Sequence, residues 1–269
     1  MDSVERDGVR LAYVEDGPAR PDGVPLLLVH GWTGDHGTFA PQLAHLRQRR
    51  RVVAVDLRGH GGSDAPRQSY GVKGFAEDVA FVAERLGLRE AVLVGHSMGG
   101  LVGLEVAAGR PGLLSGLVMI DSPLLPPAEL VDAIRPVALS LGGDGHGGIM
   151  RALAAQLFIG SDDAARREGI IDGMAAVAPH VAVSALVGHF LEYDAGPALD
   201  ACAVPLAYLA AGGAALSDLA RVQARRPDLL LARTLGSGHF STVEVPGQIN
   251  AMLDRFLELL PVLASVSGG

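Results

Sequence analysis

The sequence predicts an α/β fold, in which helices cover both faces of a mostly parallel central sheet and a helical segment is inserted between two strands. Short apolar runs rich in valine and leucine alternate with longer segments of helical spacing up to residue 121, and again after residue 203. Between these two regions no segment has the character of a strand. Alternating buried strands and helices are typical of parallel sheets covered on both faces.

The predicted strands are short and apolar, and the first of them alternates apolar with polar residues. They cover residues 9–14, 26–29, 51–56, 91–94, 117–121, 204–211 and 229–235. The alternation in 9–14 predicts an antiparallel edge strand. The predicted helices carry apolar residues three or four positions apart, and they cover residues 39–46, 70–86, 101–108, 214–226 and 245–260. Gly87 follows the second of these helices and is expected to end it.

Residues 123–202 are expected to form a helical cap, and residues 1–122 with 203–269 the core domain. Helical, amphipathic segments within the cap cover residues 128–141, 149–158, 164–177 and 181–191. The glycine-rich segment 142–148 is expected to be a flexible hinge. Asp144 and His146 within it are a candidate metal pair, but two ligands among glycines are more typical of a plain loop.

Composition and charge exclude several classes of protein. The net charge of −8 argues against nucleic acid or an anionic membrane surface as a partner. A single cysteine, Cys202, means that the fold does not depend on an intrachain disulfide. The N-terminus has no leader-like pattern, and no apolar run approaches the ~20 residues that span a bilayer. We therefore expect a cytoplasmic protein that acts on a small molecule, and a homodimer is left open.

The most informative segment is residues 95–99, which read G-H-S-M-G. This pattern matches the G-x-S-x-G nucleophile elbow, and it lies between a predicted strand and a predicted helix, as that motif requires. A serine on such a turn has its hydroxyl exposed, and the next backbone N–H lies beside it as an oxyanion donor. Ser97 is therefore the candidate nucleophile; the alternative is a glycine-rich turn with no chemistry.

A serine hydroxyl needs a general base within hydrogen-bonding reach, and the base needs an orienting acid. Of the nine histidines, His239 lies in a glycine-flanked loop after the last predicted strand, at the carboxyl edge of the sheet where ligands bind in open α/β folds. His30 is expected to shape a turn through its side chain, His60 to be structural and His96 to pack beside the serine. The remaining histidines are expected at solvated surface or lid positions.

Four segments together resemble the α/β-hydrolase superfamily, in an order and spacing similar to those of lid-bearing esterases, lactonases, carbon–carbon bond hydrolases and cofactor-free perhydrolases. They are residues 30–32 (H-G-W), 56–64 (D-L-R-G-H-G-G-S-D), 95–100 (G-H-S-M-G-G) and 238–240 (G-H-F). The resemblance covers nearly the whole chain. It implies that Ser97 is the nucleophile and His239 the base, that the backbone N–H groups of Trp32 and Met98 form the oxyanion hole, and that the cap covers the site.

The acid departs from the commonest pattern of that superfamily, which places an aspartate three residues beyond a glycine after the strand that follows the cap. Here that position, three residues after Gly212, is Ala215. Asp218 is nearby but is expected on a helix, a turn too far along. Some relatives place the acid after the strand that follows the elbow helix, where this sequence has Asp121. We therefore predict Asp121 as the acid and keep Asp218 as the alternative; Asp121 as an Asx-turn residue is the non-catalytic interpretation.

The predicted function is hydrolysis of a carboxylic ester or lactone of a small, moderately apolar substrate, with no cofactor and no metal. The alternatives are a carbon–carbon bond hydrolase or a cofactor-free oxygenase or perhydrolase on the same scaffold, and a ligand-binding receptor with slow turnover. The large apolar residues of the cap either line the pocket or pack the cap helices together: Leu139, Met150, Leu153, Phe158, Met174, Leu186, Phe190 and Leu191.

Overall fold

A computed structural model describes residues 1–143, 145–159, 163–213 and 216–267 of the 269-residue chain. Its centre is an eight-stranded sheet with the order β1-β2-β4-β3-β5-β6-β7-β8. The strands are β1 (Asp2–Arg6), β2 (Val9–Asp16), β3 (Leu26–Val29), β4 (Val52–Val55), β5 (Ala91–His96), β6 (Leu114–Ile120), β7 (Leu206–Ala210) and β8 (Leu230–Arg233). The pairs β1–β2 and β2–β4 are antiparallel, and all the other pairs are parallel. The predicted α/β fold is confirmed.

Helices cover both faces of this sheet, and the segment between β6 and β7 is mainly helical. Those outside the insertion are η1 (His36–Phe39), α1 (Ala40–Leu46), α2 (Val72–Arg85), α3 (Met98–Gly109), α9 (Leu219–Arg225), α10 (Ser241–Glu244) and α11 (Pro246–Ser267). Those between β6 and β7 are α4 (Ala128–Ser140), α5 (His146–Gln156), α6 (Ala164–Ala176), α7 (Pro179–Leu186), the π-helical turn η2 (Val187–Leu191) and α8 (Gly196–Ala201).

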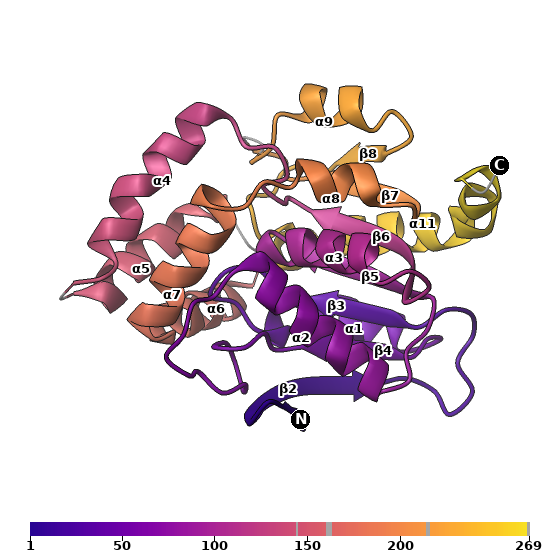
Figure 1. The fold of residues 1–269 in the computed structure, drawn as a ribbon, viewed down its shortest axis with the longest axis horizontal. Coiled ribbons are helices and arrows are strands. Elements are labelled where there is room, and N and C mark those ends of the chain that lie inside the picture. Colours follow the sequence, from indigo (N-terminus) through magenta and orange to yellow (C-terminus); the bar gives the residue numbers. More distant parts are fainter. Residues whose placement is uncertain (144, 160–162, 214–215, 268–269) are drawn as a thin grey trace.

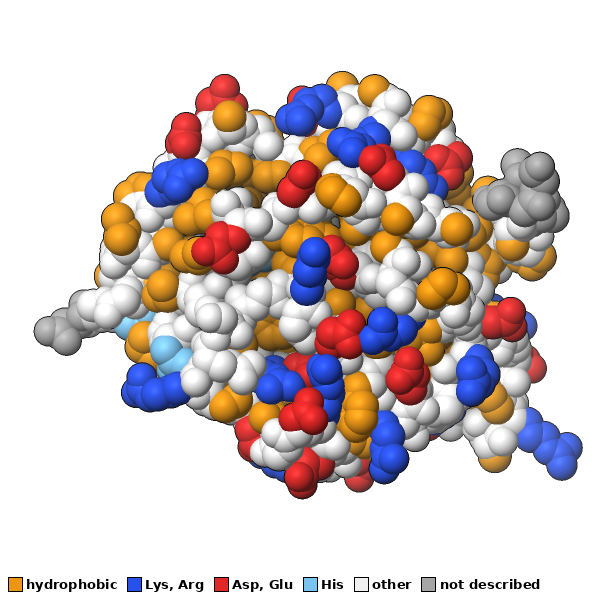
Figure 2. Space-filling view, in the orientation of Figure 1, with side chains coloured by type: hydrophobic (Ala, Val, Ile, Leu, Met, Phe, Trp, Pro, Cys, Tyr) orange, Lys and Arg blue, Asp and Glu red, His pale blue; other side chains and the backbone are white. Residues whose placement is uncertain are grey.

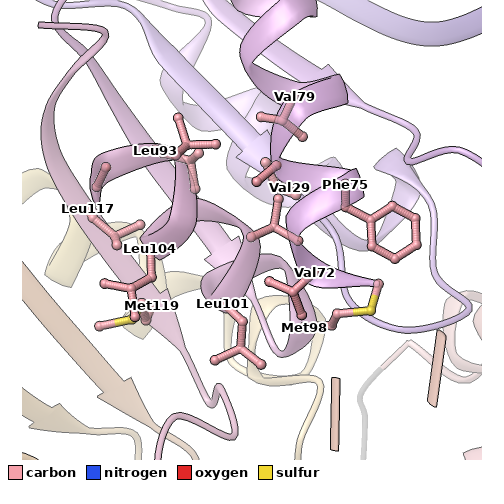
Figure 3. Packing of buried hydrophobic residues seen from close by; sticks show 14 of the residues in the cluster. Val29, Val72, Phe75, Val79, Leu93, Met98, Leu101, Leu104, Leu117 and Met119 are labelled. Carbon is pink, nitrogen blue, oxygen red and sulfur yellow. The ribbon is translucent and has the colours of Figure 1, made fainter. Parts of the chain in front are cut away.

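Two hydrophobic layers hold the helices to the sheet. Helices α2, α3 and α8 pack on one face, and α1 and α11 pack on the other. Figure 3 shows side chains of α2 and α3 meeting those of the strands, among them Val72, Phe75, Met98, Leu101, Val29 and Leu93. Strands covered on both faces need not alternate apolar with polar residues. This is why the four residues of β3 and the four of β4 are all apolar and all buried.

Helix α2 ends as the sequence predicts. Gly87 has φ +67°, and its N–H donates to the carbonyl of Glu84 (3.1 Å), while the N–H of Leu88 donates to the carbonyl of Ala83 (2.9 Å). This pair of bonds is a Schellman motif, which requires a left-handed residue and therefore favours glycine. The chain then enters the loop that leads into β5 and the elbow.

Helices α4 to α7 with η2, which we call the cap helices, lie together at one end of the molecule (Figure 1). They surround a third hydrophobic cluster, which includes Met150, Phe158 and Met174 and reaches Phe240 of the core. Helix α8 packs instead with the α3 layer. The division of the chain at residues 123 and 202 stays a prediction.

No single helix of the described chain has the length and hydropathy to span a membrane. Helix α6 and the segment Pro179–Leu191 pass this test only as a pair, with a bend of 95° between them. On the face shown in Figure 2, acidic and basic side chains are interspersed.

The structure corrects the expectations for the strand at residues 9–14 and for the glycine-rich segment 142–148, and it adds two short helices. The strand predicted at 9–14 is antiparallel but is not an edge strand, because Asp2–Arg6 pairs with it through a tight turn at Asp7 and Gly8 and takes the edge itself. Helices α8 and α10 were not predicted, because they are too short to show a clear period in the sequence. Gly147 and Gly148 belong to α5, so the expected hinge is partly helical.

His146 has no ring nitrogen available for a metal. Its Nδ1 lies 2.9 Å from the carbonyl oxygen of Leu141, and its Nε2 lies 3.0 Å from that of Val177. The other half of the candidate metal pair, Asp144, lies outside the described residues, as does Ala215. Among the described residues no cluster of three or more metal-ligating side chains occurs.

Candidate active site

The carboxyl ends of the parallel strands bring the predicted site residues to one edge of the sheet. The loop with Trp32 follows β3, Ser97 follows β5, Asp121 follows β6 and His239 lies in the loop after β8. Strands β3, β5 and β6 are direct neighbours, so three of these loops start side by side. Ser97 and His239 line one cavity, which Trp32 also lines.

Ser97 occupies a strained turn between β5 and α3. Its backbone has φ +53° and ψ −123°, a region that non-glycine residues rarely adopt. Its N–H donates to the carbonyl of Ile120 (2.8 Å), which ties the turn to the end of β6. A Cβ on Gly31 would lie 2.8 Å from the Cβ of Ser97, so the loop after β3 runs directly against the serine. This is the geometry of a nucleophile elbow.

The glycines of the elbow are required by close backbone contacts. A Cβ on Gly95 would lie 2.3 Å from the carbonyl oxygen of Gly99, and a Cβ on Gly99 would lie 2.1 Å from the carbonyl oxygen of Val29. Neither oxygen belongs to a flexible side chain. The turn is therefore compatible only with glycine at these positions.

We expect Gly99→Ala to lower the free energy of unfolding by about 3 kcal/mol, because the new methyl group pushes α3 away from β3. The midpoint of a urea transition measures this loss. Gly74→Ala is the matched control, since Gly74 also lies in the first turn of a helix but has open space where its Cβ would be. It should stabilise the protein by about 0.5 kcal/mol. Equal midpoints for the two variants would contradict the contact argument.

Asp121 and His239 are joined by a hydrogen bond at the edge of the sheet. The Nδ1–H of His239 donates to Oδ2 of Asp121 (2.8 Å), and Oδ1 of Asp121 accepts from the N–H of Ala211 (3.3 Å). The Asp121 residue is 1% exposed, and its backbone has φ +45°. Its carboxylate bonds to distant residues rather than to its own turn. Since Nδ1 carries the proton, Nε2 of His239 is left as an acceptor for a proton from the cavity.

Asp218 has a different role. Its carboxylate accepts from the N–H of Arg221 (3.1 Å) and so caps the N-terminus of α9. The sequence placed it on the helix, whereas it lies at the N-cap position. Of these two aspartates, only Asp121 bonds to His239.

Ser97 and His239 are not joined by a hydrogen bond in the described chain, although both line the cavity. Hydrogen bonds between catalytic groups are often long before substrate binds. The N–H of Met98 is the first of α3 and has no acceptor within the helix. That of Trp32 donates to no backbone carbonyl of the described residues. Both amides are thus available beside Ser97.

His96 and His30 form hydrogen bonds to the loops that carry His239 and Trp32. The Nε2–H of His96 donates to the carbonyl of His239 (2.9 Å), and the two rings lie 4.6 Å apart. Burial and the neighbouring His239 hold the pKa of His96 well below its usual value, so the ring is neutral. His30 accepts from the N–H of Leu57 (3.0 Å) at Nε2 and donates to the carbonyl of Gly31 (2.8 Å) at Nδ1. The turn-shaping role predicted for His30 is confirmed.

His60 is fully buried beneath these residues. Its Nδ1 lies 2.9 Å from the carbonyl oxygen of Arg58, and its ring packs against His30 and Phe75. Burial lowers the pKa of His60 to about 3, so the ring is uncharged at neutral pH. The structural role predicted for it is confirmed.

The cavity over Ser97 has a volume of about 290 Å³ and is mainly apolar. The cap helices and the core loops contribute its apolar residues, which are Trp32, Leu130, Ile134, Val137, Leu153, Leu157, Met174, Leu186, Phe190, Leu216 and Phe240. Four of the cap residues named from the sequence line it, namely Leu153, Met174, Leu186 and Phe190. Met150 and Phe158 pack between helices instead, and Leu139 is exposed. No Asp, Glu, Lys or Arg occurs among the described lining residues.

The cap is bonded directly to two of the loops that carry site residues. The indole Nε1–H of Trp32 donates to the carbonyl of Ala182 on α7 (2.8 Å). The N–H of His239 donates to the carbonyl of Leu157, just after α5 (2.8 Å). The buried carboxylate of Glu244 accepts from the N–H groups of Gly238 (2.8 Å) and Ile159 (3.0 Å). The cap therefore helps to fix the loop of His239.

Two buried residues of this region, Glu244 and His189, were not predicted as site residues from the sequence. His189 lines the cavity, and Glu244 bonds to the loop of His239. Glu244 lies in the four-residue helix α10, and its position five residues after His239 carries no recognised pattern. His189 was expected at a solvated surface or lid position. It lies in the cap, but it is buried, so the solvated alternative is wrong.

Comparison with known proteins agrees with this architecture. A family model described as the alpha/beta hydrolase fold matches residues 24–147, the segment that holds Trp32, Ser97 and Asp121. The non-heme chloroperoxidase of Streptomyces lividans is 37% identical over 137 residues, which are 50% of this chain and 48% of that protein. The chain thus spans about half the length of the curated relatives it matches, or less.

Two solved structures superpose on nearly the whole chain. A thermophilic esterase from Thermogutta terrifontis has a TM-score of 0.83 and 25% identity, and the match covers 96% of this chain and 97% of that one. The enol-lactonase from Burkholderia xenovorans LB400 has a TM-score of 0.84 and 22% identity, with 96% and 100% covered. The fold and the elbow define the class of protein: the chain has the α/β-hydrolase fold. Solved structures described as an esterase and an enol-lactonase share this fold.

Proposed function

We propose that this protein is a serine hydrolase that cleaves a carboxylic ester or lactone of a small, moderately apolar substrate through an acyl-enzyme. The observation that carries the proposal is the placement of His239. It lines the same cavity as Ser97, and its Nδ1–H is held by the carboxylate of Asp121. A nucleophile on a strained turn, an imidazole and a buried carboxylate that orients it are the parts that acyl transfer needs.

In the proposed reaction the hydroxyl oxygen of Ser97 attacks the carbonyl carbon, and Nε2 of His239 takes the hydroxyl proton. The N–H groups of Trp32 and Met98 stabilise the negative charge that forms on the carbonyl oxygen. Asp121 keeps the proton of His239 on Nδ1 and stabilises the imidazolium. His239 then donates its proton to the leaving alcohol. Water, activated by the same histidine, hydrolyses the acyl-enzyme and restores Ser97.

The lining of the cavity supports an uncharged substrate. Burying a carboxylate without a partner costs several kcal/mol, and no charged residue occurs in the described lining. An alkyl or aryl group is stabilised there by about 25 cal/mol for each Å² of apolar surface removed from water. Relatives described as an esterase and an enol-lactonase share the fold.

A panel of 4-nitrophenyl esters tests the proposal. We expect kcat/KM to rise from acetate to butanoate and hexanoate, because each added methylene contributes about 0.8 kcal/mol of apolar burial while the cavity still has room. The monoester of succinate should react at least about tenfold more slowly than butanoate, because its carboxylate loses water without gaining a partner. Release of 4-nitrophenolate measures both comparisons. A preference for the succinate ester would overturn the assigned substrate class.

A second candidate function is suggested by the 37% identity to a non-heme chloroperoxidase over half of the chain. Attack of hydrogen peroxide on the acyl-enzyme, in place of water, would release a peracid from the same Ser97 ester. Peracid formed from an ester and hydrogen peroxide, faster than the ester is hydrolysed, would favour this function over simple hydrolysis.

A further inference from the structure

The most unusual polar group of the cavity is His189, on the π-helical turn η2 of the cap. His189 is 3% exposed, and it lines the cavity together with Ser97 and His239. Its surroundings in the cap are apolar: Leu186 and Phe190 line the cavity on either side of it in sequence. A polar side chain among apolar residues is costly to bury unless its polar atoms are hydrogen-bonded, so a histidine in such a place requires an explanation.

The contacts of His189 define which nitrogen is an acceptor. Its Nδ1 lies 2.5 Å from the carbonyl oxygen of Ala185, and because a carbonyl only accepts, Nδ1 carries the proton. Burial lowers the pKa of His189 to about 4, with a smaller contribution from His239, so the ring is neutral at physiological pH. Nε2 is then an acceptor, and no group in the described residues donates to it.

The turn that carries His189 is fixed to the core. A Cβ on Gly188 would lie 2.4 Å from the carbonyl oxygen of Tyr70, and the hydroxyl of Ser184 accepts from the N–H of Tyr70 (2.8 Å). The bond from the N–H of Glu192 to the carbonyl of Val187 (3.1 Å) encloses one residue more than an α-helical bond. His189 is the middle residue of this widened turn. Its acceptor is therefore held in place before any ligand binds.

We propose that His189 is a specificity-determining residue, whose Nε2 accepts a hydrogen bond from a hydroxyl or amide N–H of the substrate within the mainly apolar cavity. The inference rests on the proposed function and narrows it: the preferred ester carries a hydrogen-bond donor away from the scissile carbonyl. A site built around a buried acceptor discriminates against an analogue that lacks the donor, because the acceptor then stays unpaired.

Pairs of 4-nitrophenyl esters that differ only in a hydroxyl or a methyl group test this inference. Suitable pairs are 3-hydroxybutanoate with 3-methylbutanoate, 6-hydroxyhexanoate with heptanoate, and 4-hydroxyphenylacetate with 4-methylphenylacetate, which place the hydroxyl at three depths. The measured quantity is the ratio of kcat/KM for the hydroxyl ester to that for the methyl ester. Both values come from the same enzyme preparation, so the ratio does not depend on the fraction of a variant that folds.

We expect at least one pair for which His189→Phe lowers this ratio by about tenfold, the size of one net hydrogen bond. Phenylalanine keeps the ring and removes both nitrogens. His189→Gln places an amide oxygen near the position of Nε2, and it should keep most of the wild-type ratio. His189→Leu serves in place of His189→Phe if the latter does not fold. Equal ratios in the wild type and in the Phe or Leu variant, for all three pairs, would overturn the inference.

A failure of the proposed function gives a different result, since the wild type would then release 4-nitrophenolate from neither ester of any pair. In that case calorimetric dissociation constants for 4-hydroxyphenylacetamide and 4-methylphenylacetamide test His189 without turnover. Tighter binding of the hydroxyl compound in the wild type but not in His189→Phe supports the inference. Equal affinities in both proteins reject it.

Discussion

Replacing Ser97 by alanine is expected to lower kcat for 4-nitrophenyl esters by about five to six orders of magnitude, because the acyl-enzyme can no longer form. Ser97 supplies the only hydroxyl oxygen at the elbow, where β5 meets α3 and His239 lines the same cavity. Activity that remains would come from water attack aided by the oxyanion donors and by binding alone. Initial rates at saturating ester, with active protein measured separately, give this ratio.

As a control, the Ser97→Ala variant should fold and bind ligand as the wild type does. The hydroxyl of Ser97 makes no hydrogen bond within the described residues, so its removal leaves no buried partner unpaired. The melting temperature should change little, and 4-hydroxyphenylacetamide should bind as it does to the wild type. Ester turnover that survives in Ser97→Ala at near wild-type rates would falsify the serine mechanism and move attention to other groups of the cavity.

Replacing Asp121 by asparagine is expected to lower kcat by about four orders of magnitude. The carboxylate accepts the Nδ1–H of His239 at 2.8 Å and is 1% exposed, so its charge acts with little screening on the imidazolium that forms during the reaction. An asparagine amide turned toward His239 favours the wrong tautomer, with the proton on Nε2. The loss should appear in kcat more than in KM, because Asp121 does not line the cavity.

Asp218→Asn is the matched control for Asp121→Asn, since both variants exchange a carboxylate for an amide. Asp121 follows β6, and Asp218 lies between β7 and α9. Asp218 caps α9 through its bond to the N–H of Arg221, and asparagine caps a helix about as well as aspartate. We expect kcat and the melting temperature to stay close to those of the wild type. The opposite ranking of the two variants would show that the acid is not Asp121.

The sheet was largely predictable because its strands have a local signature. Residues 26–29 and 52–55 are continuous valine, leucine and alanine runs, and the structure buries every one of them. The N-terminal strand Asp2–Arg6 was not predictable in the same way. Four of its five residues are polar or charged, and it is a strand only because it pairs with β2 at the edge of the sheet.

The histidines also differ in whether neighbouring residues or the tertiary structure decide their role. His30 and Gly31 are neighbours in the chain, so the turn that His30 shapes could be inferred from their order. His189 could not be placed, because its burial depends on a π-helical turn that packs against Tyr70, more than 100 positions away in sequence. No period of the sequence marks where a helix gains one residue in a turn.

Residues 95–99 and their flanking segments were enough to predict a strand, a serine on a tight turn and a helix, because a nucleophile elbow is built from five adjacent residues whose sizes decide its geometry. The pairing of Asp121 with His239 was decided only by the tertiary structure. The two residues are 118 positions apart, and they meet because β6 and the loop after β8 end at the same edge of a parallel sheet. The cavity is likewise tertiary, since core loops and cap helices meet around it, and the apolar residues of the cap look alike in sequence whether they face the cavity or each other.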